Sequence, residues 1–237
     1  MSDLRDFLIG CSFTDPTWQD AVPWSVLWGR ENPCFISAKA GMGIKGICTE
    51  ARYYMQSLQA PVRRAIVILP DLWRYDIEVD VETYLCNAMV DFVSSDSEGW
   101  RVEIPAERKW VTSGGLHYRK DTEFAKIFDF LYRHQGFLVI LKEHLRALSQ
   151  LIDYFKSQKI QYHISAIQDP LDQLVGLDYI KQDVLLLLEQ VDYHNWIRFG
   201  NGFIDKFLNH QDHPNDHEHE KIYQYLKDYI KRSPPND

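Results

Sequence analysis

Short apolar runs alternate along the chain with longer segments in which apolar residues recur every three or four positions. Continuous runs rich in branched side chains are typical of strands buried on both faces of a sheet, and the wider spacing is typical of helices. The runs predict five strands, at 4–9, 33–38, 64–69, 160–167 and 196–199. The spacing predicts helices over 17–28 (with Pro23 limiting its length), 44–58, 122–134, 138–158 and 169–190, and a last one through Ile222, Leu226 and Ile230.

This alternation of strands and helices indicates the fold class. Strands that follow one another through helices form a parallel sheet covered by helices, because each helix packs its apolar stripe on a face of the sheet. The chain of 237 residues is long enough for one such domain, and we expect a single domain over 1–237. The pattern loosens over 79–136, which we interpret as an insertion after the third strand or a cover over the site.

Composition and charge exclude several classes of protein. Hydrophobic residues make up 45% of the chain and charged residues 25%, as in ordinary globular proteins. The net charge of -8 disfavours nucleic acid as a partner, since phosphate contacts need clustered Lys and Arg. The four cysteines, at 11, 34, 48 and 86, form no CxxC pair, so neither a zinc ribbon nor a redox dithiol is indicated. No apolar leader and no run of about 20 apolar residues is present, so we expect a cytoplasmic protein without a membrane partner. The oligomeric state is not indicated.

Candidate chemistry gathers where the predicted strands end. Gly10 allows a sharp turn after the first strand, and Ser12 follows it at the edge where parallel sheets bind ligands. The glycine-rich turn around Gly41 leads into a helix, whose free N–H groups can hold an oxyanion or a phosphate. Charged and aromatic residues at 71–76 follow the third strand and form either a substrate wall or a solvated loop. A strand-exit serine with no chemical role is the competing interpretation of Ser12.

Histidines cluster before the last predicted helix. Four of the nine histidines fall in the ten residues 210–219, among carboxylates. One interpretation is a metal site, because imidazole and carboxylate are common ligands. Another is a solvated loop. A third needs only His213, held by the rigid Pro214 as a general base within reach of Ser12.

Three short motifs resemble blocks of the SGNH/GDSL hydrolases. The run Gly-Cys-Ser-Phe-Thr at 10–14 resembles their first block, in a variant common in bacterial and phage-encoded members. Residues 40–43 resemble the second block, and 213–215 with His219 resemble the closing block, although Glu218 stands where glycine is usual. The resemblance covers both ends and the first three strands. It implies a flavodoxin-like, three-layer α/β/α sandwich around a mostly parallel five-stranded sheet, with the insertion after the third strand.

The resemblance also implies a mechanism. Ser12 is the expected nucleophile, His213 the base, and the N–H groups of Ser12 and Gly41 the oxyanion hole. The family's third block supplies an asparagine that this chain lacks after its third strand. Arg74 or the indole of Trp73 is the candidate for that missing donor.

The position of the family's triad aspartate, which orients the histidine, also differs in this chain. The family's aspartate lies three residues before the histidine, where this chain has His210. Asp212 is the nearest carboxylate, yet adjacent side chains rarely orient one another. A Ser–His dyad, with the imidazole oriented by a backbone carbonyl, is the alternative to a triad.

The expected function is therefore hydrolysis of a small-molecule or carbohydrate ester through an acyl-enzyme, with no cofactor. Two other hypotheses stay open. The substitutions at the asparagine and aspartate positions are compatible with a binding protein that keeps the fold without the chemistry. A metal-dependent hydrolase would use His210, Asp212, His213, His217 and His219.

Overall fold

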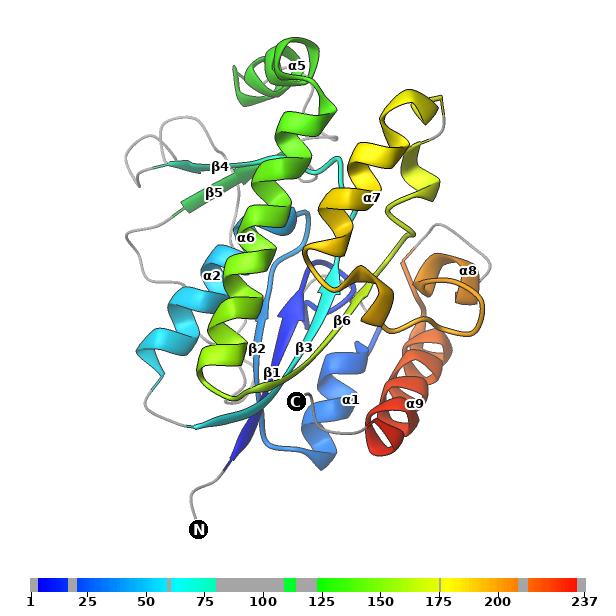
Figure 1. Ribbon diagram of the computed structural model, residues 1–237. Coiled ribbons are helices and arrows are strands. Elements are labelled where there is room, and N and C mark those ends of the chain that lie inside the picture. The colour runs from blue at the N-terminus through cyan, green and yellow to red at the C-terminus, as the bar shows by residue number, and fades with distance from the viewer. Residues whose placement is uncertain are drawn as a thin grey trace.

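The computed structural model describes residues 4–16, 21–58, 61–79, 109–113, 123–174, 176–208 and 213–233. Within them the chain is an α/β protein with a four-stranded, all-parallel sheet and seven helices (Figure 1). The sheet contains β1 (Arg5–Gly10), β2 (Cys34–Ala38), β3 (Val62–Leu69) and β6 (Gln161–Ala166). The helices are α1 (Trp24–Glu31), α2 (Ile44–Ser57), α5 (Glu123–Gln135), α6 (Phe137–Ser157), α7 (Lys181–Glu189), α8 (Ile204–Leu208) and α9 (Asp216–Arg232).

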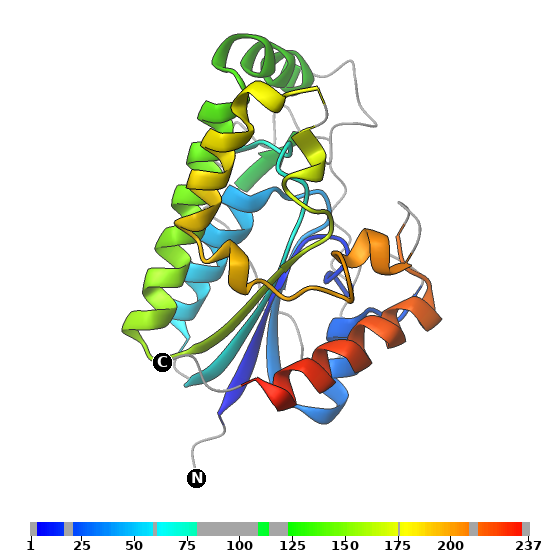
Figure 2. The same cartoon turned by 45° about the vertical axis from the view of Figure 1, so that its right-hand side comes forward.

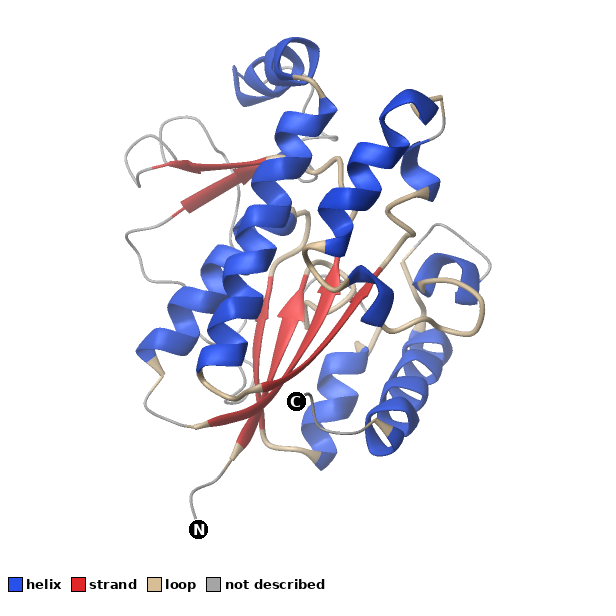
Figure 3. Cartoon of the chain, viewed as in Figure 1, coloured by secondary structure: helices blue, strands red, loops and turns tan. Residues whose placement is uncertain are grey.

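The strand order is β2-β1-β3-β6, so the chain reverses its direction across the sheet between β1 and β3. Helices α1 and α9 cover one face, and α2, α6 and α7 lie on the other (Figures 2 and 3). In the parallel register Gly10 lies opposite Ala38 of β2 and Ile68 of β3, so these strands end almost level. Ligands bind at such a reversal, outside the carboxyl ends of the strands, because the flanking connections there leave toward opposite faces.

Buried side chains of the core hold the two central strands, β1 and β3, in place. Three consecutive residues of β1, Phe7 to Ile9, and three of β3, Ile66 to Ile68, are fully buried. Burying each such side chain contributes about 1.5–3 kcal/mol, so the two central strands are held firmly between the helix layers. The predicted amphipathic helices behave as expected, since Leu148 of α6 and Leu226 of α9 are fully buried on their inner faces.

The fifth predicted strand, at 196–199, is not confirmed. This segment runs beside β6, where Ile197 N–H donates to Ile164 O at 2.7 Å, but the described residues contain no fifth strand in the sheet. Phe199 forms only an isolated bridge to Gly202. The turn that follows, with Gly200 at φ 68°, bends the chain away before a ladder can develop.

Two helix predictions are wrong in their bounds. The helix expected over 17–28 begins only at Trp24, with Pro23 as its N-cap, because proline is tolerated at the start of a helix and not inside it. The single helix expected over 169–190 is divided into η1 (Asp172–Leu174), η2 (Asp178–Ile180) and α7. Gly176, at φ 79°, interrupts the helical path between the two short turns.

Part of the predicted insertion forms a small antiparallel pair. Strands β4 (Asp76–Val79) and β5 (Lys109–Thr112) hydrogen bond to each other. Much of the expected insertion over 79–136 lies outside the described residues. None of the helices in the described part of the chain combines the length and apolar character needed to span a bilayer.

Candidate active site

Ser12 lies in a tight turn directly after β1. The N–H groups of Thr14 and Asp15 both donate to the carbonyl of Cys11 at 2.9 Å, which closes the turn around Ser12. A Cβ on Gly10 would lie 2.2 Å from Thr14 Oγ1, so only glycine fits at the start of the turn. Burial raises the pKa of the Cys11 thiol, which disfavours its thiolate form, so Ser12 is the better candidate nucleophile in this turn.

His213 meets Ser12 from the other end of the chain. Its Nε2 lies 2.8 Å from Ser12 Oγ, across 201 positions of sequence. The ring of Phe13 lies beside the imidazole, with 5.2 Å between the two centroids. The structure thus brings the two predicted side chains together, at the hydrogen-bonding distance that a nucleophile and its general base need.

Helix α9 begins right behind this histidine. Asn215 is its N-cap: the Asn215 side chain accepts from Glu218 N–H at 3.1 Å, and the Glu218 carboxylate accepts from Asn215 N–H at 2.9 Å. This reciprocal capping box satisfies two N–H groups that a helix start otherwise leaves unpaired. Glu218, the departure from the family's closing block, thus has a structural reason, and the cap fixes the backbone two residues beyond His213.

His219 has a structural role as well. It is fully buried, and its Nδ1 accepts a hydrogen bond of 3.3 Å from the N–H of Trp24 at the start of α1. Burial lowers the pKa of His219 to about 4, so the ring stays neutral and remains an acceptor. Asp216 binds the same region by accepting from Val22 N–H at 2.6 Å. Together these contacts join α9 to α1.

The described histidines of the segment 210–219 do not point to one common site. His213 is directed to Ser12, His219 to α1, and His217 is exposed. No group of three or more His, Cys, Asp or Glu in the described part of the chain could hold a metal ion. His210 and Asp212, the two candidates for orienting His213, lie outside the described residues.

The loop after β2 places Gly41 beside the nucleophile turn. Lys39 N–H donates to Gly10 O at 3.3 Å, and Ala40 N–H donates to the Asp15 carboxylate at 3.0 Å. Gly41 has φ 78°, a conformation that glycine adopts without strain. Neither Ser12 N–H nor Gly41 N–H has an acceptor among the described residues. Two backbone donors are thus available at the edge of the sheet where the serine lies.

The loop after β3 contains both candidates for a third donor, Arg74 and Trp73. Arg74 Nε donates to Asp71 at 3.2 Å, and the guanidinium lies within electrostatic range of Cys11. Trp73 packs its ring against Phe137 of α6, with centroids 4.0 Å apart. A cavity of about 440 Å³ lies against this loop, within the size range of small-molecule sites. It is lined by Asp71, Trp73, Arg74, Tyr132 and Gln168.

Asp76 ends the charged and aromatic segment 71–76, but the sequence did not indicate its role. It is fully buried at the start of β4, and its carboxylate accepts from Gly43 N–H and Gly46 N–H, each at 2.8 Å. Burial raises the pKa of Asp76 to about 6, although the two N–H donors oppose the shift. A carboxylate at a helix N-terminus is stabilised by the unpaired N–H groups there. Its partners lie 30 or more positions away, so no local pattern could have indicated it.

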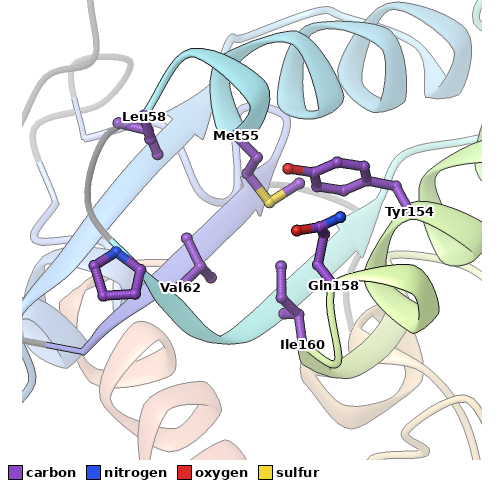
Figure 4. Close-up of a pocket in the computed structure, with 7 residues that line it drawn as sticks. Met55, Leu58, Val62, Tyr154, Gln158 and Ile160 are labelled. Atoms are coloured by element: carbon purple, nitrogen blue, oxygen red, sulfur yellow. The ribbon is translucent and has the colours of Figure 1, made fainter.

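A second cavity, of about 310 Å³, lies at the opposite edge of the sheet (Figure 4). Val62 begins β3 and Ile160 precedes β6, so this cavity is at the amino ends of the strands. It is lined by Met55, Leu58, Pro61, Val62, Tyr154, Gln158 and Ile160. No carboxylate, amine or imidazole is among these residues, so the cavity has no part in the candidate site.

Comparison with known protein families finds no matching family, and no curated protein matches the chain. The resemblance to the SGNH/GDSL hydrolases therefore rests on the three short motifs. The support for a function therefore comes from the geometry around Ser12.

Proposed function

We propose that the protein is a serine hydrolase of the SGNH/GDSL type that cleaves ester bonds through an acyl-enzyme. One observation carries the proposal: the hydrogen bond of 2.8 Å between Ser12 Oγ and His213 Nε2, at the carboxyl ends of the central strands. A serine hydroxyl is a weak nucleophile until an adjacent base accepts its proton. The strand order β2-β1-β3-β6 supports the same location, because parallel sheets bind ligands at the carboxyl ends of the strands where the order reverses.

The proposed reaction has two halves. His213 takes the proton of Ser12, the oxygen attacks the ester carbonyl, and His213 returns the proton to the leaving alcohol. Water then attacks the acyl-enzyme with the same base. The N–H groups of Ser12 and Gly41 stabilise the oxyanion in both halves, since both lack an acceptor among the described residues.

Arg74 is the stronger candidate for a third donor. Its guanidinium lies near the Ser12 turn, whereas the ring of Trp73 packs against Phe137. An arginine would bring a full positive charge to the developing oxyanion, where the family uses a neutral amide. Removal of one oxyanion donor typically costs about 10²- to 10³-fold in rate, so this position matters for activity.

The substrate class follows from the resemblance and the cavity. We propose a small-molecule or carbohydrate ester, whose non-reacting part occupies the cavity of about 440 Å³ beside the loop after β3. Its lining combines aromatic rings with hydrogen-bonding groups, which suits a ligand with both apolar and hydroxyl surfaces. Trp73 and Tyr132 supply the aromatic walls.

Replacing the nucleophile tests the proposal. Ser12→Ala should abolish catalytic turnover of p-nitrophenyl acetate and labelling by a fluorophosphonate probe, because an activated serine is the nucleophile that the proposed mechanism requires for both. Ser157→Ala, an exposed serine at the far end of α6, is the matched control and should keep both activities. Thermal unfolding of both variants should match that of the wild type. Hydrolysis retained in Ser12→Ala would remove Ser12 from the mechanism.

The alternative is a binding protein that keeps the fold without catalysis. The absence of the family's asparagine, with Arg74 in the loop after β3, favours it. The same probe separates the two functions: a wild-type protein that is folded and does not react with the fluorophosphonate supports binding alone.

A further inference from the structure

The end of strand β5 contacts both loops of the candidate site, the one after β2 and the one after β3. Thr112, its last residue, donates its hydroxyl hydrogen to the carbonyl of Gly41. Ser113 exchanges two hydrogen bonds with Tyr75, each of 2.9 Å, one through its N–H and one through its Oγ. A segment from the region outside the family motifs thus contacts the loops that follow β2 and β3.

Gly41 needs external support to present its N–H. Glycine has little preference between positive and negative φ, so the peptide between Ala40 and Gly41 can rotate at small cost. A rotated peptide would direct the N–H away from the reacting carbonyl. Two hydrogen bonds hold the peptides on either side of this one: Asp15 accepts from Ala40 N–H, and Thr112 donates to Gly41 O. They fix the Cα atoms of Ala40 and Gly41, and with them the position of the Gly41 N–H in the loop.

We infer that Thr112 is a positioning residue that holds the Gly41 N–H in the oxyanion hole. The inference rests on the proposed hydrolase function. Thr112 touches neither the nucleophile nor the base; it acts through the Gly41 backbone. The strand pair β4–β5 then completes the site, and it does so with a side chain 71 positions away from the glycine.

The hydroxyl of Thr112 is not needed to attach the strand pair. β4 is already held to α2 through Asp76, which accepts from Gly43 N–H and Gly46 N–H, and β5 is held through Ser113 and Tyr75. Loss of the hydroxyl should therefore leave the hairpin in place. Its effect should be limited to the position of the Gly41 backbone in the loop after β2.

Thr112→Val and Thr112→Ser test the inference. Valine keeps the shape and removes the hydroxyl, so kcat for p-nitrophenyl acetate should fall about 10- to 100-fold, with KM changed less than about twofold. This is less than the loss of about 10²- to 10³-fold for a removed oxyanion donor, because the Gly41 N–H is displaced and not removed. Serine keeps the hydroxyl and should restore kcat to within about threefold of the wild type. Thr49→Val on α2 is the matched control and should leave both constants unchanged.

The outcomes separate the inference from the proposed function. If Ser12→Ala is inactive and Thr112→Val keeps the wild-type kcat, the inference is overturned and the hydrolase remains. A rise in KM with unchanged kcat, or a loss of thermal stability alone, likewise assigns Thr112 a purely structural role. Activity retained in Ser12→Ala overturns the function itself. Should Thr112→Val fail to fold, Thr112→Cys replaces it: a thiol is a weak donor, and a kcat equal to that of Thr112→Ser would contradict the inference.

Discussion

At the scale of single residues, the site depends on one hydrogen bond between distant parts of the chain. Ser12 is fixed by its turn, and His213 is fixed by the capped helix that follows it. The sequence motifs could indicate this pair because both residues lie in recognisable short blocks. They could not indicate Thr112, since a threonine at the end of a short strand has no local signature and its partner is Gly41, 71 positions away.

The first prediction concerns His213. His213→Gln should lower kcat about 10²- to 10⁴-fold, the usual contribution of a general base, while stability stays unchanged because the side chain is exposed. His217→Gln is the matched control: it is exposed four residues later and should keep full activity. Steady-state kinetics and the rate of fluorophosphonate labelling measure the effect. A His213→Gln variant within tenfold of the wild type would exclude His213 as the base.

At the scale of elements, continuous apolar runs predicted the central strands well, whereas the bounds of several helices were predicted poorly. The central strands β1 and β3 follow from such runs, since strands buried on both faces are mostly apolar, whereas β6 was predicted from a more alternating pattern and lies at the edge of the sheet. The run at 196–199 contains Arg198 and is held to β6 by one backbone hydrogen bond and one from Ser165 Oγ to Ile197 O, without a ladder among the described residues. The helix at 169–190 fails at Gly176, whose positive φ only the folded chain reveals. The capping box of α9 was detectable from sequence, because an asparagine followed three residues later by glutamate is its signature.

The second prediction concerns this cap. Asn215→Ala should lower the free energy of unfolding by about 1 kcal/mol, because Glu218 N–H loses its acceptor at the start of α9. Asn201→Ala, in an exposed turn, serves as the control and should change stability by less than about 0.5 kcal/mol. Urea denaturation followed by circular dichroism measures both. Equal midpoints for the two variants would contradict the assigned role of the cap.

At the scale of the whole molecule, several buried ionisable groups couple stability to pH. Burial lowers the pKa of His144, His163 and His219 to about 4, from the ordinary value of 6.5. The unfolded chain therefore binds more protons than the folded chain between pH 6.5 and 4, and stability falls as the pH drops through this window. Burial raises the pKa of Asp76 from 3.8 to about 6, which has the opposite effect over nearly the same window.

Because these contributions overlap, the clearest test removes one of them. His144 is fully buried in α6 near Tyr75. His144→Leu replaces the imidazole with an apolar side chain of similar size that does not titrate. The depressed pKa costs the wild type about 3 kcal/mol of stability by pH 4, taking about 1.4 kcal/mol for each unit of pKa difference. The stability of His144→Leu relative to the wild type should therefore increase by that amount between pH 7 and pH 4. Urea denaturation at a series of pH values measures the difference, and parallel curves for the two proteins would show that His144 is not titrated on unfolding.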